Sequence, residues 1–157
     1  MQPLYVSDVM NASVVTISEE APLRDALSLM HQHKISGLVA VDHAGYMVGI
    51  ISQTDLLRAW QEAPDFTAIQ NSPVSQYMTH EVISCAPHKS LDYALQQLDQ
   101  HQIRRLVVVE THTGGRFVTD RVKPVGILSQ TDIVRALIGK VGDAEAEETP
   151  ATNTAEA

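Results

Sequence analysis

The chain has 157 residues, of which 44% are hydrophobic and 19% are charged, and its formal net charge is −8. This composition excludes fibrous and wholly disordered proteins. No apolar run approaches the roughly 18 residues of a membrane helix, and the first ten residues lack the basic and apolar regions of a secretion signal. With a single cysteine, Cys85, the chain can form neither an internal disulfide nor a cysteine-based zinc site, and we expect a cytoplasmic protein.

Negative charge is concentrated at the C-terminal end. Five acids and no Lys or Arg lie between Asp143 and Ala157, so residues 1–142 carry only about −3. This end also lacks aromatic, Val, Ile and Leu side chains, and we expect residues 141–157 to form a disordered acidic tail. The nearly neutral remainder disfavours nucleic-acid binding. A local basic patch could still be formed by Arg104, Arg105, Arg116, Arg121 and Lys123.

The chain contains an internal repeat. Residues 6–41 align without gaps to residues 74–109, with 13 of 36 pairs identical. After a nine-residue insertion, residues 49–59 match residues 126–136 at eight of eleven positions. The alignment predicts a first unit over residues 3–60, a linker over 61–73 anchored by Phe66 and Ile69, and a second unit over 74–140.

In the first unit the elements follow one another at short spacing. A turn over residues 6–10 precedes a β-rich run at Val14–Ile17, and Pro22 opens a helix. A buried strand, Leu38–Val41, turns through Asp42–Gly45 into a strand at Met47–Ile51. A last helix begins near Ser52. The apolar face predicted for the first helix consists of Leu23, Ala26, Leu27 and Met30.

The second unit repeats this order. We expect strands at Val82–Cys85, Leu106–Val109 and Val125–Leu128, with a polar loop over Thr111–Pro124 and a final helix from Ser129. Its first helix repeats the apolar face with Leu91, Ala94, Leu95 and Leu98. One unit is too small to bury its helices and sheet well, so we expect an α/β (α+β) fold in which both units pack into one body.

Motifs in this order resemble the CBS domain, named after cystathionine β-synthase. They are VSDVM and VSQYM, then ISGLVAV and IRRLVVV, then GIISQTDLLRA and GILSQTDIVRA. The resemblance implies two tandem CBS repeats (short helix-β-α-β-β-α) packed as a pseudo-twofold pair. It also implies a regulatory or signalling protein that is not an enzyme, needs no obligatory cofactor, and binds AMP, ADP, ATP or S-adenosylmethionine as a regulatory ligand between the repeats.

The motif Ser52-Gln-Thr54-Asp55 and its copy at residues 129–132 each begin a predicted helix. Ser with an acid three residues later is a helix-capping box, which needs no ligand. The same geometry presents hydroxyls and free N–H groups, which commonly hold phosphate. The resemblance implies that Asp55 and Asp132 hold a ribose. It also implies that four hydroxyls lie near phosphate, those of Ser52, Thr54, Ser129 and Thr131.

Further site residues come from the same resemblance. It places Thr16 and Ser84 against the base and ribose, and Arg104 and Arg105 against phosphates. The first repeat has Ser36 and Gly37 in place of the arginine pair. We therefore expect two unequal sites, of which only one suits a phosphate-bearing ligand.

Alternative interpretations remain at this point. The protein could be a ligand-free interaction scaffold, and seven histidines raise a weak metal hypothesis, although His31 and His33 cannot share a helix face. The residues form no recognisable catalytic group. By resemblance we expect a homodimer that delivers a conformational change to a partner protein the sequence does not name. The dimer surface predicted on the last helices comprises Leu57, Trp60, Val134 and Leu137.

Overall fold

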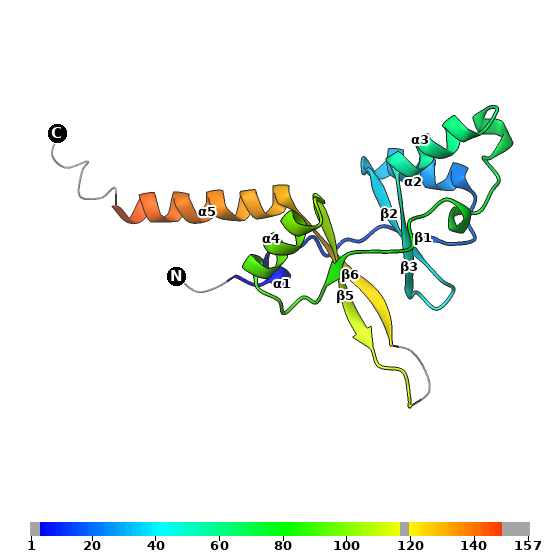
Figure 1. The fold of residues 1–157 in the computed structure, drawn as a ribbon. Helices are drawn as coiled ribbons and strands as arrows, with labels where there is room; N and C mark the ends of the chain where they lie inside the picture. Colours follow the sequence, from blue (N-terminus) through cyan, green and yellow to red (C-terminus); the bar gives the residue numbers. More distant parts are fainter. Residues whose placement is uncertain (1–3, 117–119, 149–157) are drawn as a thin grey trace, which may run out of the picture.

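Two three-stranded sheets organise the computed structural model, which describes residues 4–116 and 120–148 (Figure 1). In each sheet the first strand is parallel to the second, and the second is antiparallel to the third. The first sheet contains β1 (Thr16–Ser18), β2 (Gly37–Val41) and β3 (Met47–Ser52), and the second contains β4 (Ser84–Cys85), β5 (Arg105–His112) and β6 (Arg121–Ser129). The predicted α+β repeat is confirmed.

Helices cover the outer side of each sheet. These are α2 (Leu23–His33) and α3 (Gln53–Glu62) on the first sheet, and α4 (Leu91–Gln100) and the start of α5 (Gln130–Glu148) on the second. Beyond its start, α5 projects away from the body (Figure 1). The predicted apolar faces are buried, with one exception in each repeat. Leu27 and Leu95 are exposed, whereas Leu23, Ala26 and Met30 reach the core. The buried stripe is therefore narrower than predicted: Leu23, Ala26 and Met30 form it in the first repeat, and Leu27 lies at its edge.

The two repeats exchange their leading segments. The first turn, α1 (Val6–Val9), packs into the core of the second repeat, and the turn η2 (Val74–Gln76) packs into the core of the first. The Val6 N–H donates to the Lys89 carbonyl at 2.8 Å, and the Val74 N–H donates to the Ala21 carbonyl at 2.8 Å. Neither core is complete without a segment from the other repeat.

The segment between the repeats is anchored to the first core. It contains the short turn η1 (Phe66–Ala68), and Ile69 after it is buried against α2 and α3 residues of the first core. Both apolar anchors expected in this segment therefore contact the body. The segment between the repeats thus leads directly to Val74, which packs into the core of the first repeat.

The inner faces of the two sheets meet along a third apolar cluster. Val39 of β2 and Val107 and Val109 of β5 are its buried centre, and Ile50 and Ile127 pack against them. This contact joins the repeats into one body, as the sequence predicted. The strands β3 and β6 also lie next to each other across this interface.

The expected polar loop over residues 111–124 is shorter in the structure, because the flanking strands extend into both of its ends. β5 runs to His112 and β6 starts at Arg121, with Val122 opposite Thr111. The hairpin is held by Tyr46 of the first repeat: the Lys123 ammonium lies 5.1 Å and the Arg121 guanidinium 5.4 Å from the Tyr46 ring centroid. These contacts between the repeats favour the longer strands. They also involve Arg121 and Lys123, two members of the local basic patch considered from the sequence.

The acidic end also differs from expectation. The helix α5 continues through residues 141–148, which were predicted to be disordered. Ala and Glu dominate this stretch, and both favour helices. A helix that is already nucleated also extends at low cost. The remainder of the predicted tail, residues 149–157, lies outside the described residues. Among the helices that the structure describes, none has the length and apolar content to cross a membrane.

Candidate functional site

A cleft of about 360 Å³ lies between the two repeats. Both sheets contribute to it: β2 and β3 form one side, and β5 and β6 form the other. Its lining residues are Asn11, Ser13, Val15, Ile35, Ser36, Gly37, Leu38, Val39, Ile50, Ser52, Arg105, Leu106, Val107, Ile127, Ser129 and Asp132. Small-ligand sites typically range from roughly 300 to 1,000 Å³, so the cleft fits a nucleoside-sized molecule.

Apolar side chains form about half of the cleft lining, and polar side chains form most of the rest. Val15, Val39 and Ile50 line it from the first repeat, and Val107 and Ile127 from the second. A flat ring can insert between such side chains without needing a charged partner. Two of the polar lining side chains are charged, Asp132 and Arg105, and the others are Asn11, Ser13, Ser36, Ser52 and Ser129. The arrangement suits a ligand with one apolar and one polar part.

Asp132 and Ser129 form the polar end of the cleft. The Ser129 N–H donates to Oδ2 of Asp132 at 3.0 Å, and the Asp132 N–H donates to Oγ of Ser129 at 3.1 Å. These are the capping contacts predicted from sequence. Oδ1 of Asp132 lies 3.9 Å from the Arg135 guanidinium, and the carboxylate side chain keeps 20% of its surface exposed. The cap therefore leaves a carboxylate edge that can accept hydrogen bonds from a bound diol.

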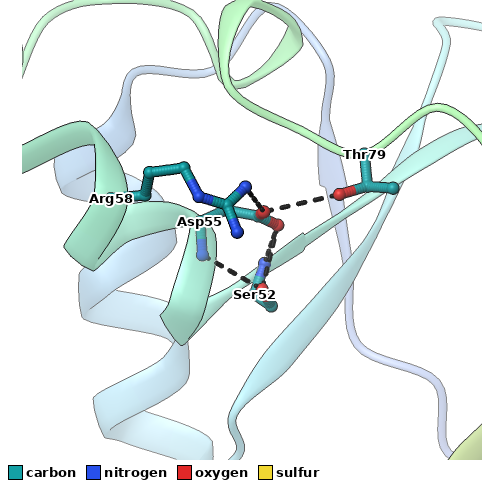
Figure 2. Close-up of polar contacts among 4 residues, drawn as sticks. All are labelled: Ser52, Asp55, Arg58 and Thr79. Atoms are coloured by element: carbon teal, nitrogen blue, oxygen red, sulfur yellow. Dashed lines mark hydrogen bonds and ion pairs between the residues drawn. The ribbon is translucent and has the colours of Figure 1, made fainter. Parts of the chain in front are cut away.

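Asp55, its counterpart in the first repeat, is closed off (Figure 2). Oδ2 of Asp55 accepts from the N–H and the hydroxyl of Ser52, both at 2.9 Å. Oδ1 accepts from the Thr79 hydroxyl at 3.4 Å and lies 3.8 Å from the Arg58 guanidinium. Only 6% of this side chain is exposed. Both oxygens are occupied by the protein, so Asp55 serves the helix cap and the junction to the second repeat.

Arg105 is the basic side chain of the cleft. Its Nη1 donates to Oγ of Ser36 at 2.5 Å, so the guanidinium spans the two repeats. An arginine side chain has five N–H donors, and this contact uses one of them. The remaining donors are available to an anion bound in the cleft. The sequence predicted that the two repeats differ here, with Arg104-Arg105 in one and Ser36-Gly37 in the other. In the structure Arg105 of the second repeat lies next to Ser36 of the first.

The structure brings only some of the predicted site residues together. Ser52, Arg105, Ser129 and Asp132 line the cleft. The cleft lining does not include Thr16, Thr54, Asp55, Ser84, Arg104 or Thr131. Thr16 is exposed in β1, and Val15 lines the cleft in its place because neighbouring strand residues face opposite sides. Thr54 and Thr131 are exposed in the first helical turns. Ser84 pairs with Val107 within the second sheet.

Sequence reasoning missed Asn11 and Ser13, which line the cleft just before the first strand. Asn11 is held there by backbone bonds to Ile127, with N–O distances of 2.8 and 2.9 Å. The repeat alignment contained a signal, because the equivalent residues are Thr79 and Glu81. At the position of Thr79, which blocks Asp55, the first repeat has an asparagine whose side chain instead accepts from the Ser13 N–H.

Other reactive groups do not converge on the cleft. Burial raises the pKa of the Cys85 thiol, and nearby Lys89 only partly offsets this. The thiol is therefore largely protonated at neutral pH and acts as a core side chain. Within residues 4–116 and 120–142, where side chains are described, no group of three or more His, Cys, Asp or Glu residues could hold a metal ion.

Comparison with known proteins assigns both repeats. The family model of the CBS domain matches residues 6–62 and again residues 74–139. The CBS domain-containing protein YhcV of Bacillus subtilis is 37% identical over 106 residues, which cover 67% of this chain and 72% of YhcV. The human 5'-AMP-activated protein kinase subunit gamma-3 is 26% identical over 129 residues, 80% of this chain. There the chain spans only 24% of the relative.

Solved structures share the fold over nearly the whole chain. AcuB from Vibrio cholerae superimposes with a TM-score of 0.73 at 28% identity, covering 92% of this chain and 98% of that one. The CBS domain pair of protein MJ0100, solved with 5-methylthioadenosine and S-adenosylmethionine, superimposes with a TM-score of 0.67 at 24% identity. It covers 88% of this chain and 99% of that chain.

Proposed function

Because the chain belongs to the CBS domain family, we propose that it is a regulatory sensor module that binds an adenosine-containing ligand in the cleft between its repeats. It has no catalytic role of its own and signals by a change in conformation or oligomeric state. The observation that carries this proposal is Asp132. Its carboxylate edge is left partly exposed by the helix cap, and it supplies the acidic group in the lining of a cleft that also has apolar walls.

The chemistry of the cleft supports this ligand class. An adenine ring fits between Val15, Val39 and Ile127, where backbone groups of the strands can pair with its edge. A ribose diol then donates to the Asp132 carboxylate, and an anionic group meets Arg105. MJ0100, which shares only the fold, was solved with two adenosyl compounds. The name of the human gamma-3 relative refers to a kinase activated by AMP.

Binding at this place would bias the arrangement of the two repeats. The cleft is lined by residues of both sheets, so a ligand in it contacts both and favours the arrangement that closes on it. A ligand at a hundredfold excess over its Kd adds about 2.7 kcal/mol to the stability of the bound state. This is enough to shift a two-state equilibrium strongly.

The test is calorimetric titration of adenosine, AMP, ADP, ATP and S-adenosylmethionine into the wild-type protein, Asp132→Asn and Asp55→Asn. An asparagine at 132 keeps one oxygen for the Ser129 cap but loses the charge that holds the diol. We expect Asp132→Asn to weaken binding about 10- to 100-fold, as the loss of a charged hydrogen bond does, and Asp55→Asn to leave affinity within twofold. Loss of binding in Asp55→Asn alone would place the ligand at the other carboxylate, and no binding by wild type would refute the proposal.

An apolar surface on the last helices favours a second role, in self-association. Leu57 and Trp60 of α3 and Val134 and Leu137 of α5 are all at least half exposed. The stripe continues along α5 through Ile138 and Val141, at the spacing of one helix face. Exposed apolar stripes of this kind mark interfaces. We infer that the protein forms a homodimer through α3 and α5. The same surface would be used if the protein were an interaction scaffold that binds no nucleotide.

A further inference from the structure

The projecting end of α5 has a charge that opposes its own helix dipole. Residues 143–148, here called the acidic end, include four acids and no Lys or Arg. Negative charge is unfavourable at the C-terminus of a helix, where the last carbonyl groups already carry partial negative charge. The preceding turns expose the apolar side chains of Leu137, Ile138 and Val141. An apolar stretch followed by an acidic end would therefore gain from a partner with an apolar and then a basic surface.

The same chain has such a surface on its first repeat. A hollow of about 420 Å³, here called the basic hollow, lies where α2 ends and α3 begins. Its lining includes the exposed residues His31, Lys34 and Arg105 together with Leu27, which is 40% exposed. Gln53, the first residue of α3, also lines it. Among the described residues that line the basic hollow there is no Asp or Glu.

The other group of cations considered from the sequence is less suited to an acidic partner. Lys123 is paired across the β5–β6 hairpin with Glu110. Arg121 directly follows Asp120 in the chain. Acids therefore stand beside both cations. The basic hollow is the better place for an acidic helix end.

The acidic end cannot reach the basic hollow of its own chain. In Figure 1, α2 and α3 lie at one end of the molecule, and α5 extends from the body toward the opposite side. The two surfaces can meet only between two copies. The apolar stretch of α5 has a partner on the way, because Leu57 and Trp60 are exposed on α3.

Helix lengths determine which orientation brings the two surfaces together. Gln53 lies seven residues before Trp60, which corresponds to about 10 Å of helix. With Leu137 against Trp60 and the helices antiparallel, residue 144 comes beside Gln53 and the last turn of α5 passes over the basic hollow. A parallel orientation would instead bring the acidic end to the C-terminal end of α3, which carries Glu62.

We propose that α5 of one copy lies antiparallel along α3 of a second copy, and that its acidic end covers the second copy's basic hollow. The proposal rests on the inferred self-association through α3 and α5, and not on the proposed ligand. The positive end of the α3 dipole then faces the acidic end. In a twofold-symmetric dimer each copy gives one such contact and receives one. Arg105 also lines the cleft, so the partner's α5 would border the candidate site.

The experiment measures the dimer dissociation constant of the full chain by sedimentation equilibrium. The hollow variant combines His31→Asp with Lys34→Gln. The second repeat has these residues at the equivalent positions, Asp99 and Gln102. Lys34 and Gln102 have the same left-handed backbone, with φ 54° and 52°, so the fold is retained.

A second variant removes charge from the acidic end. This end variant combines Glu147→Gln with Glu148→Gln, which keeps good helix formers. Two controls remove the same kinds of charge elsewhere on the surface. They are Lys89→Gln, before α4, and Glu19→Gln with Glu20→Gln, in the turn before α2.

We expect the hollow variant and the end variant each to weaken the dimer about five- to tenfold, since exposed ion pairs are weak singly but occur twice in a symmetric dimer. A protein with both sets of substitutions should dimerise no more weakly than either variant, because the attraction is already lost. The controls should stay within twofold. Added salt should weaken the wild-type dimer more than either variant.

Chemical cross-linking gives an independent readout of the contact. A carbodiimide joins a lysine to a nearby carboxylate without a spacer. In an equal mixture of isotopically labelled and unlabelled protein, we expect peptides that join Lys34 of one copy to an acid of residues 143–148 of the other.

Two results would overturn the proposal. One is a dimer whose dissociation constant changes in neither variant. The other is a loss in the combined protein equal to the sum of the two separate losses in free energy. If Trp60→Asp still gives a monomer in these cases, the inferred dimer through α3 and α5 survives and only the contact of the acidic end is wrong. A wild-type protein that is monomeric at every concentration tested would refute the dimer together with this contact.

Discussion

The Thr79 hydroxyl lies 3.4 Å from Oδ1 of Asp55 and fills the place that Asp132 leaves open in the other repeat. Thr79 is brought there by the exchanged segment, whose backbone pairs with Ile50 on both sides. The equivalent segment carries Asn11 to Asp132, and there the asparagine accepts from the Ser13 N–H. Two identical capping motifs thus have different surroundings. One is a sealed junction and the other faces the cleft.

The first prediction concerns the stability of the sealed junction. Asp55→Ala leaves the Ser52 N–H without its partner in a nearly closed environment, and we expect the free energy of unfolding to fall by about 1–3 kcal/mol. Asp132→Ala should cost less, because its side chain is more exposed and water can replace the lost contact. Urea unfolding monitored by circular dichroism measures both. An equal loss in the two variants would contradict the difference in burial.

The second prediction isolates the contact between Thr79 and Asp55. Thr79→Ala should lower the free energy of unfolding by about 0.5–1.5 kcal/mol, the usual contribution of one hydrogen bond. In an Asp55→Ala background the same substitution should cost much less, because its partner is gone. A double-mutant cycle with urea unfolding gives this coupling. Additive effects would mean that the 3.4 Å contact contributes nothing to stability.

The third prediction concerns two glycines where the exchanged segments cross the third strands. A Cβ at Gly49 would lie 2.8 Å from the Thr79 carbonyl oxygen, and a Cβ at Gly126 would lie 3.2 Å from the Asn11 carbonyl oxygen. We expect Gly49→Ala to cost about 1–3 kcal/mol and Gly126→Ala to cost less. Thermal unfolding of both variants checks the order. Only Gly126→Ala displaces Asn11, so only this variant should also weaken ligand binding in the cleft.

The fourth prediction tests the dimer surface. Trp60 is 55% exposed, so Trp60→Asp adds a charge to the proposed interface without disturbing the core. We expect the molar mass measured by light scattering to fall from that of a dimer to that of a monomer. Gln61→Asp places the same charge on the neighbouring exposed residue of α3 and is the control. A mass that is unchanged in Trp60→Asp would remove this helix face from the interface.

The fifth prediction follows from the raised pKa of the Cys85 thiol. Burial keeps this thiol protonated in the folded protein at pH values where the unfolded chain already loses the proton. Stability contributed by Cys85 is therefore complete below the usual thiol pKa of about 8.5 and is lost as the pH rises above it. Unfolding of wild type and Cys85→Ala between pH 7 and 10 measures the difference. A difference that stays constant over this range would show that the folded thiol titrates normally.

The sequence predicted the repeated order of elements because its signals are local. Capping by Ser52 and Ser129, the apolar positions of α2 and α4, and the turn at Gly45 involve residues only a few positions apart. Such short-range preferences are expressed wherever the segment lies in the fold. The register of the β5–β6 hairpin was missed, because its extension packs on Tyr46, more than sixty residues away in the chain.

The candidate site was predicted in part for the same reason. Ser129 and Asp132 could be found because the cap and the ligand edge belong to one motif, and Arg105 because it directly precedes the buried part of β5. The exclusion of Asp55 could not be found in this way. It depends on a hydroxyl from a segment that crosses over from the other repeat.

By itself the sequence determined the two repeats, their helices and strands, and the caps that begin α3 and α5. Only the packing of the two repeats decided which of two identical motifs faces the cleft and which segment closes off the other. Local backbone preferences act over a few residues. The walls of the cleft and the contact between Thr79 and Asp55 form only when segments far apart in the chain are packed together.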